Sequence, residues 1–142
     1  MDVASRLFAQ AVAALRAVAG PGASEADLLG VLTVAEGVRR GLDRAGVVAL
    51  ADLERRGTFS ERGYRSSAAA LGDLLGWERA EARRHLTAAE QVRPRVGLHG
   101  AALPPRLPAT AAAFETGAAD LRHVEVVARV SASDAAGRPG PR

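Results

Sequence analysis

The sequence predicts an all-α fold, and three observations support that prediction. Apolar residues make up 48% of the 142-residue chain and aromatic residues only 4%, so a core has to be built mainly from Ala, Leu and Val. Such small side chains favour closely packed helices over a β-sandwich, which needs more aromatic and β-branched residues. Apolar positions recur at spacings of three and four, and no segment alternates apolar and polar residues as a strand does. The length suits one helical domain, expected over residues 1–133.

The first two helices are expected on either side of a Gly-Pro-Gly turn. Residues 2–19 form the first, with an apolar face made of Leu7, Ala11, Ala14 and Val18. Ser24, followed three residues later by Asp27, is expected to cap a second helix over residues 25–56. At ~1.5 Å per residue this helix would be about 48 Å long. Gly57 is expected to end it, which makes 25–57 the long-helix segment.

The long helix carries an apolar heptad seam beside a stripe of glycines. The seam breaks at Arg39 and Gly46, and its apolar members are Leu28, Leu32, Ala35, Leu42, Ala49 and Leu53. We expect it to be buried against the first helix, a second chain or a missing domain, because an exposed apolar stripe usually marks an interface. Each interior glycine costs roughly 0.5–1 kcal/mol, so another helix is expected to approach closely over the stripe. The stripe consists of Gly30, Gly37 and Gly41.

Residues 66–92 have the spacing of a helix-turn-helix unit, after a loop expected over 57–65. Ser66 is expected to open a helix through Leu75, Gly76-Trp77 to form the turn, and residues 78–92 the second helix. The residues expected to face inward are Leu71, Leu74, Leu75, Ala82, Leu86 and Ala89.

The outer face of the second helix in this unit supplies the candidate DNA-binding residues. Arginine positions a protein on phosphates and can read guanine in the major groove. The alternative is a purely structural hairpin, whose glutamates pair with the arginines as a solvated face. The candidate residues are Arg79, Arg83, Arg84 and Thr87.

The C-terminal part is expected to contain two short helices after a loop rich in Pro and Gly, residues 93–106. Pro108 suits the first turn of a helix that ends at Gly117. Asp120 is expected to cap a last helix through about Val130. The predicted helical domain ends at residue 133, and 134–142 are expected to be a disordered tail or linker.

Positive charge is concentrated in one stretch of the chain. All 19 basic residues are Arg, the net charge is +3 and the isoelectric point is near 10.8. Ala, Arg and Gly have GC-rich codons, so the overall bias is weak support for a nucleic-acid partner. Residues 55–95, however, hold nine Arg against five acidic residues, whereas the rest of the chain has a net charge of −1. This concentration of arginine favours a DNA-binding role over a protein-interaction role.

The sequence predicts no catalytic, cofactor or metal site. The chain has no Cys, which excludes disulfides and thiolate zinc sites. His85, His99 and His123 lack metal-ligand spacing, and each is expected to be a surface or half-buried residue. No phosphate-binding loop, nucleophile elbow or zinc-protease motif occurs. No segment has the roughly 20 apolar residues of a membrane span or the layout of a signal peptide, so a cytoplasmic location without a membrane partner is expected.

An ordered set of short motifs resembles the actinobacterial domain of unknown function 222 over residues 25–133. The motifs are LERRG at 53–57, GYRSSAA at 63–69, LLGWxRAEARR at 74–84, LPATAA at 107–112 with Gly117, and HVxVVAR at 123–129, where x is any residue. The resemblance implies a helical domain of the kind that precedes an HNH nuclease domain, which cuts DNA with a bound metal. This chain has no HNH motif, so nuclease activity is carried over to none of its residues.

Two hypotheses of function follow. The first is a module that binds or targets double-stranded DNA for a nuclease system, which the concentration of Arg and the resemblance favour. The second is a helical protein–protein or homodimerisation module that uses the heptad seam. The two are compatible, since helix-turn-helix proteins often bind DNA as dimers.

Overall fold

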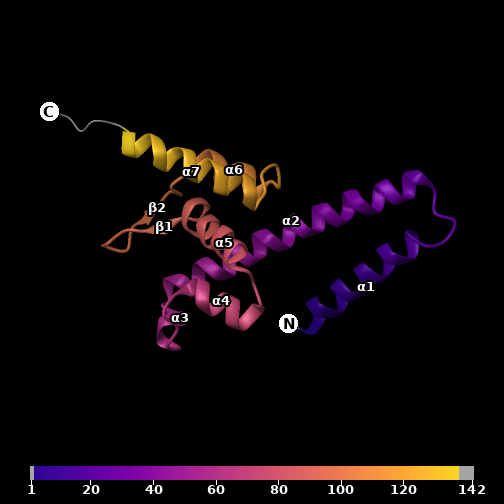
Figure 1. The fold of residues 1–142 in the computed structure, drawn as a ribbon, viewed down its shortest axis with the longest axis horizontal. Coiled ribbons are helices and arrows are strands. Elements are labelled where there is room, and N and C mark those ends of the chain that lie inside the picture. The colour runs from indigo at the N-terminus through magenta and orange to yellow at the C-terminus, as the bar shows by residue number, and fades with distance from the viewer. Residues whose placement is uncertain (1, 138–142) are drawn as a thin grey trace. The chain divides into compact units, whose positions relative to one another are not determined.

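The structure, a computed structural model, describes residues 2–137 and is predominantly helical there, which confirms the predicted all-α fold (Figure 1). The helices in this range are α1 (Asp2–Val18), α2 (Glu25–Arg55), α3 (Thr58–Glu61), α4 (Ser67–Leu75), α5 (Arg79–Val92), α6 (Pro108–Glu115) and α7 (Leu121–Gly137). The strands β1 (Arg95–Val96) and β2 (Ala102–Leu103) pair as an antiparallel hairpin. None of the helices in this range combines the length and the apolarity that crossing a membrane requires.

Local sequence signals fix the helix ends close to where they are predicted. Ser24 and Asp27 form a reciprocal capping box, in which each backbone N–H donates to the other side chain, at 3.0 and 3.1 Å. Ser66 accepts a bond of 3.1 Å from the first turn of α4. Gly57 and Gly76, both with φ of 68°, adopt the left-handed conformation after α2 and α4. An L-residue rarely takes that conformation, so glycine is favoured at both helix ends.

The chain divides into two compact units, residues 1–40 and residues 41–142. The first unit contains α1 and the first half of α2, and none of its described side chains is buried. Leu28 and Leu32 are 45% and 67% exposed, so the expectation that the first helix covers the seam is wrong. A Cβ on Gly30 or Gly37 would meet nothing within 4 Å, so the close helix approach predicted there is also absent from the described chain.

The second unit has a core built around α5, which packs against α4, α6 and α7. From α2 the core takes Val47 and Leu50, while the predicted seam residues Leu42, Ala49 and Leu53 remain exposed. At 3.6 residues per turn, the buried pair lies about 100° around the helix from the predicted seam. The remaining buried apolar residues are Phe59, Ala70, Leu71, Ala82, Ala88, Ala89, Val92, Phe114, Ala119, Leu121 and Val124.

Several predicted loop and tail boundaries need correction. The loop predicted over residues 57–65 contains the helical turn α3, because Phe59 is buried in the core and holds the segment there. The loop predicted over residues 93–106 contains the β1–β2 hairpin. Helix α7 runs to Gly137, past the predicted end near Val130 and into the predicted tail. The rest of that tail, residues 138–142, lies outside the described residues.

Two further side-chain predictions in α4 are wrong. Leu71 is buried as expected, but Leu74 and Leu75 are 49% and 56% exposed. They occupy the last turn of α4, where the chain leaves the core for the turn at Gly76. Apolar residues in a final helical turn therefore need not face inward.

Candidate functional site

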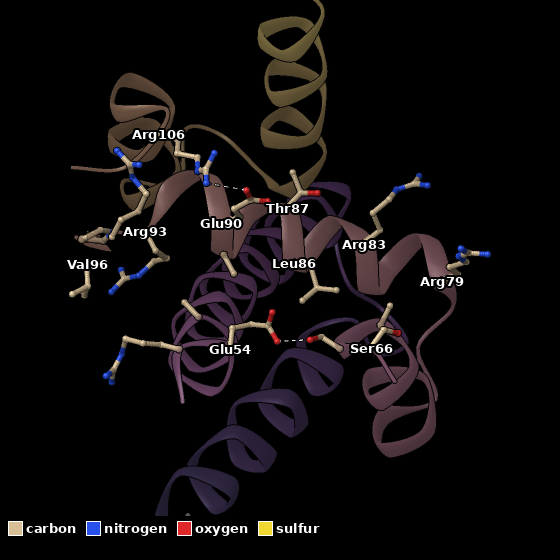
Figure 2. A pocket seen from close by; sticks show the side chains of 17 residues that line it. Glu54, Ser66, Arg79, Arg83, Leu86, Thr87, Glu90, Arg93, Val96 and Arg106 are labelled. Carbon is tan, nitrogen blue, oxygen red and sulfur yellow. Dashed lines mark hydrogen bonds and ion pairs between the residues drawn. The ribbon is translucent and has the colours of Figure 1, made fainter. Parts of the chain in front are cut away.

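The second unit contains a hollow of about 770 Å³ whose wall is rich in arginine. It is formed by the C-terminal end of α2, the start of α4, one side of α5 and the segment that carries the β1–β2 hairpin (Figure 2). We call it the arginine hollow. Its two acidic residues are Glu54 and Glu90, and its six arginines are Arg55, Arg79, Arg83, Arg93, Arg95 and Arg106.

The floor of the arginine hollow is apolar, with one carboxylate among small side chains. Ala51, Ala68 and Ala89 line it, and Leu86 of α5 points into it (Figure 2). Glu54 also points inward, and its carboxylate accepts a hydrogen bond from the hydroxyl of Ser67 at the start of α4. A small anion on this floor would meet the carboxylate of Glu54, so the floor does not favour anion binding.

One side of the hollow is formed by the exposed stripe of α5. Arg79 and Arg83 are one helical turn apart, and both side chains extend outward from the axis of α5 (Figure 2). Arg83 is held by Glu125 of α7, with 3.2 Å between Nη2 and Oε1, yet its side chain is 63% exposed. Thr87, which is half-buried, also lines the hollow from α5.

The opposite side is formed by the arginines of the hairpin segment. Arg93 and Arg95 flank the start of β1, and Arg106 follows β2. Arg106 pairs with Glu90 of α5 at 3.5 Å (Figure 2). The Nε of Arg95 donates to the backbone oxygen of Pro104 at 3.1 Å, which ties the two arms of the hairpin together. Guanidinium groups therefore stand on two sides of the hollow rather than converging on one point.

Arg84, the fourth sequence candidate, does not line the arginine hollow. It lies about 100° around α5 from Arg83 and pairs with Glu81 and with Glu125, at 3.2 Å each. Burial pushes the pKa of Glu125 up, but hydrogen bonds from Arg84 and Arg83 outweigh that effect and hold the pKa below its ordinary value. Arg84 therefore joins α5 to α7, as in the solvated-face alternative, although it is half-buried.

His85 is buried, so the prediction of a surface or half-buried residue is wrong for it; His99 and His123 are exposed. Its ring stacks on Trp77 with 4.2 Å between centroids. Its Nδ1 lies 3.3 Å from a carboxylate oxygen of Glu81, and its Nε2 lies 3.9 Å from Asp43. Within residues 2–137, no cluster of three or more His, Cys, Asp or Glu side chains is arranged to hold a metal ion.

Sequence reasoning missed four of the six arginines in the hollow. Arg55, Arg93 and Arg95 lie in the stretch of excess positive charge, and Arg106 lies in the segment predicted to be a loop. The excess of positive charge over residues 55–95 indicated the first three of these arginines, and no sequence signal indicated Arg106. The charge count could not show that two distant segments would meet across α5.

A comparison with protein-family models places residues 29–135 in the family described as "Domain of unknown function (DUF222)". The chain belongs to the DUF222 family. Comparisons with curated proteins and with solved structures found no match. The matched range contains every residue of the arginine hollow and excludes α1.

Proposed function

We propose that this DUF222 domain is a non-catalytic module that binds double-stranded DNA through its phosphates. The observation that carries the proposal is the arginine hollow, with six arginines against two glutamates. Guanidinium groups stay charged at physiological pH, and their planar forks match phosphate oxygens in bidentate contacts. A concave surface with an excess of one charge sign also concentrates and steers an oppositely charged ligand.

The arrangement of the arginines favours an extended polyanion over a small anion. Arg79 and Arg83 stand on one side of the hollow and Arg93 and Arg106 on the other, while Glu54 lies between them (Figure 2). A single phosphate cannot meet both sides and avoid the carboxylate. Duplex DNA carries about one charge per 1.7 Å of its axis, so its backbone can satisfy arginines that do not converge.

The burial of α5 favours phosphate contact over base reading. A recognition helix places one face deep in a major groove about 12 Å wide. Helix α5 instead packs on three other helices, and its exposed stripe lies along the hollow. We therefore assign Arg79, Arg83 and Thr87 to phosphate contacts, give Arg84 a positioning role, and expect little sequence preference.

The biological setting is part of the same proposal. The resemblance to domains that precede HNH nucleases supports a role in targeting DNA for such a nuclease, in an actinobacterial cytoplasm. In that role the cleavage chemistry belongs to the nuclease, and this domain supplies affinity for the substrate.

The test is a salt titration of binding to a fluorescein-labelled duplex of about 25 base pairs, followed by anisotropy. The double variant Arg79→Ala/Arg93→Ala removes one arginine from each side, and Arg16→Ala/Arg122→Ala removes two exposed arginines outside the hollow. The first should lower the slope of log affinity against log salt by about two units, since each phosphate contact contributes roughly one. The second should leave the slope unchanged. Equal slopes for both variants, or no binding by the wild-type chain below about 100 μM at low salt, would refute the proposal.

A second function, as a helical dimerisation module, is supported by the exposure of the first unit. Large apolar side chains line both of its helices, including Leu7 at 61%, Leu29 at 59% and Leu32 at 67%. A patch of this kind usually marks an interface. Sedimentation equilibrium should then show a dimer for the wild-type chain and a monomer for Leu32→Asp. A wild-type monomer at 100 μM would rule this function out.

A further inference from the structure

The β1–β2 hairpin ends in a narrow tip that carries two side chains. Gly100 donates its N–H to the carbonyl of Gly97 at 2.9 Å, and Gly97 donates to the carbonyl of Ala101 at 2.8 Å. Leu98 and His99 are therefore the two corner residues of a tight turn. Gly100 has a φ of 79°, a conformation that favours glycine. Because both flanking residues lack a side chain, the tip is slim.

Leu98 at this tip is fully exposed, at 103% of its reference area. Val96, at the end of β1, is 62% exposed. Single exposed leucines are common on protein surfaces. Leu98 differs from such scattered leucines in its position, because it lies at the end of a projecting hairpin that begins beside the arginines of the hollow.

The base of the hairpin is fixed to α5, which lines the hollow. Leu107, after β2, donates its backbone N–H to the carbonyl of Gln91 at 3.1 Å. The ion pair between Arg106 and Glu90 adds a second connection between the same two segments. Arg95 is bound to Pro104 across the hairpin. The tip therefore has a defined position beside the hollow, about three residues or ~10 Å beyond its base.

We propose that this tip enters the minor groove of the duplex whose phosphates the arginine hollow holds, with Leu98 packed between the groove walls. The inference rests on the proposed function. The minor groove is about 6 Å wide, which suits a tip with two side chains, whereas the major groove is about twice as wide. Minor-groove proteins commonly insert an apolar wedge such as Leu beside phosphate-binding Arg residues. Arg93 and Arg95 at the hairpin base supply those phosphate contacts.

The experiment measures affinity and salt slope on an A·T-rich duplex for the full chain and two matched variants. Leu98→Ala removes the wedge, while Leu74→Ala makes the same truncation at an exposed α4 residue outside the hollow. We expect Leu98→Ala to bind about tenfold more weakly, because apolar surface buried in the groove is lost. Its salt slope should match that of the wild type, since no phosphate contact is removed. Leu74→Ala should bind as the wild type does.

A second arm uses a duplex saturated with netropsin, a small molecule that fills the A·T minor groove. On that duplex the wild-type chain should lose the advantage it has over Leu98→Ala. Wild-type binding that is insensitive to both Leu98→Ala and netropsin would overturn the minor-groove inference and leave phosphate binding intact. A wild-type chain without salt-dependent duplex affinity would overturn both.

The third arm tests the other ligand that an apolar tip beside arginines suits. Wild-type chain is sedimented with vesicles that contain an anionic phospholipid, without DNA. Sedimentation of the wild type but not of Leu98→Ala would assign the tip to a lipid surface and overturn the inference. No sedimentation of either protein is the expected result. A duplex RNA control should bind without any Leu98 dependence, because the minor groove of A-form RNA is wide and shallow.

Discussion

The two units of this chain differ in burial: among the described residues 2–137, only those of the second unit include buried side chains. Residues 2–40 form helices with clear apolar faces and bury none of their side chains, whereas all the buried apolar side chains lie between Val47 and Val124. The three phenylalanines show the contrast. Phe59 and Phe114 are 6% and 3% exposed, and Phe8 is 46% exposed. An amphipathic face is therefore necessary for a core but does not create one without a second surface to pack on.

This difference in burial also assigns the two proposed functions to different units. The second unit has a core that can hold the arginines of the hollow in fixed positions, which a binding surface needs. The first unit offers apolar area without such a framework, which suits burial against another chain. The range that matches DUF222 contains the whole second-unit core and begins only at residue 29.

The largest expected effect comes from placing a charge at matched valines of the two units. Val124 is completely buried and Val34 is 51% exposed. Val124→Asp should unfold the protein, because an unpaired buried carboxylate costs several kcal/mol against a total stability of about 5–15 kcal/mol. Val34→Asp should change the free energy of unfolding by no more than about 0.5 kcal/mol in the monomer. Thermal unfolding followed by circular dichroism checks both, and a folded Val124→Asp would contradict the assignment of the core.

The sequence predicted the parts of the fold that depend on neighbours along the chain. The capping box at Ser24 and the glycine at the end of α2 were correctly located because their hydrogen bonds and dihedral angles are local. The buried face of α2 was not, because the choice between Ala49 and Leu50 depends on α5 and the other helices that pack there. Tertiary packing against other helices, rather than the local sequence, determines which face of a helix is buried.

The candidate site was predicted in part for the same reason. Three of the four residues named on α5 line the hollow, since a helix keeps residues four apart on one face. Arg84 is one residue out of phase, and its partner Glu125 lies 41 positions away in sequence. The hairpin arginines could not be assigned to the site, because a loop rich in Pro and Gly has no period from which to infer its course.

Replacing glycine by alanine is expected to change the free energy of unfolding by a smaller amount, with opposite signs in the two units. Gly37 lies within α2 with open space around it, so Gly37→Ala should stabilise the helix by roughly 0.5–1 kcal/mol. Gly76 has a φ of 68°, where alanine is strained, so Gly76→Ala should destabilise the protein by about 1 kcal/mol or more. Urea unfolding of both variants measures the sign. Destabilisation by Gly37→Ala would mean that a partner packs against that glycine stripe.

The smallest expected effect is the pH-dependent contribution of the Glu125 ion pairs to the melting temperature. Because the pKa of Glu125 is lowered in the folded state, the stabilisation is present above the ordinary value of 4.5 and is lost as pH falls through the folded-state value. Wild type should therefore melt at most a few degrees above Glu125→Gln at pH 7, and this difference in melting temperature should be smaller at pH 3. The two melting temperatures, measured at both pH values, give the result. A difference as large at pH 3 as at pH 7 would show that the pairing is not electrostatic.

The central claim is that DNA binds to the second unit at the arginine hollow and not to the first unit. Nuclear magnetic resonance of the arginine Nε–Hε groups tests it directly, as unlabelled duplex DNA is added to the ¹⁵N-labelled chain. We predict that the resonances of Arg79, Arg93 and Arg95 shift in a salt-dependent way, while those of Arg6 and Arg16 in α1 stay in place. Shifts confined to α1, or shifts of equal size over all 19 arginines, would contradict the account.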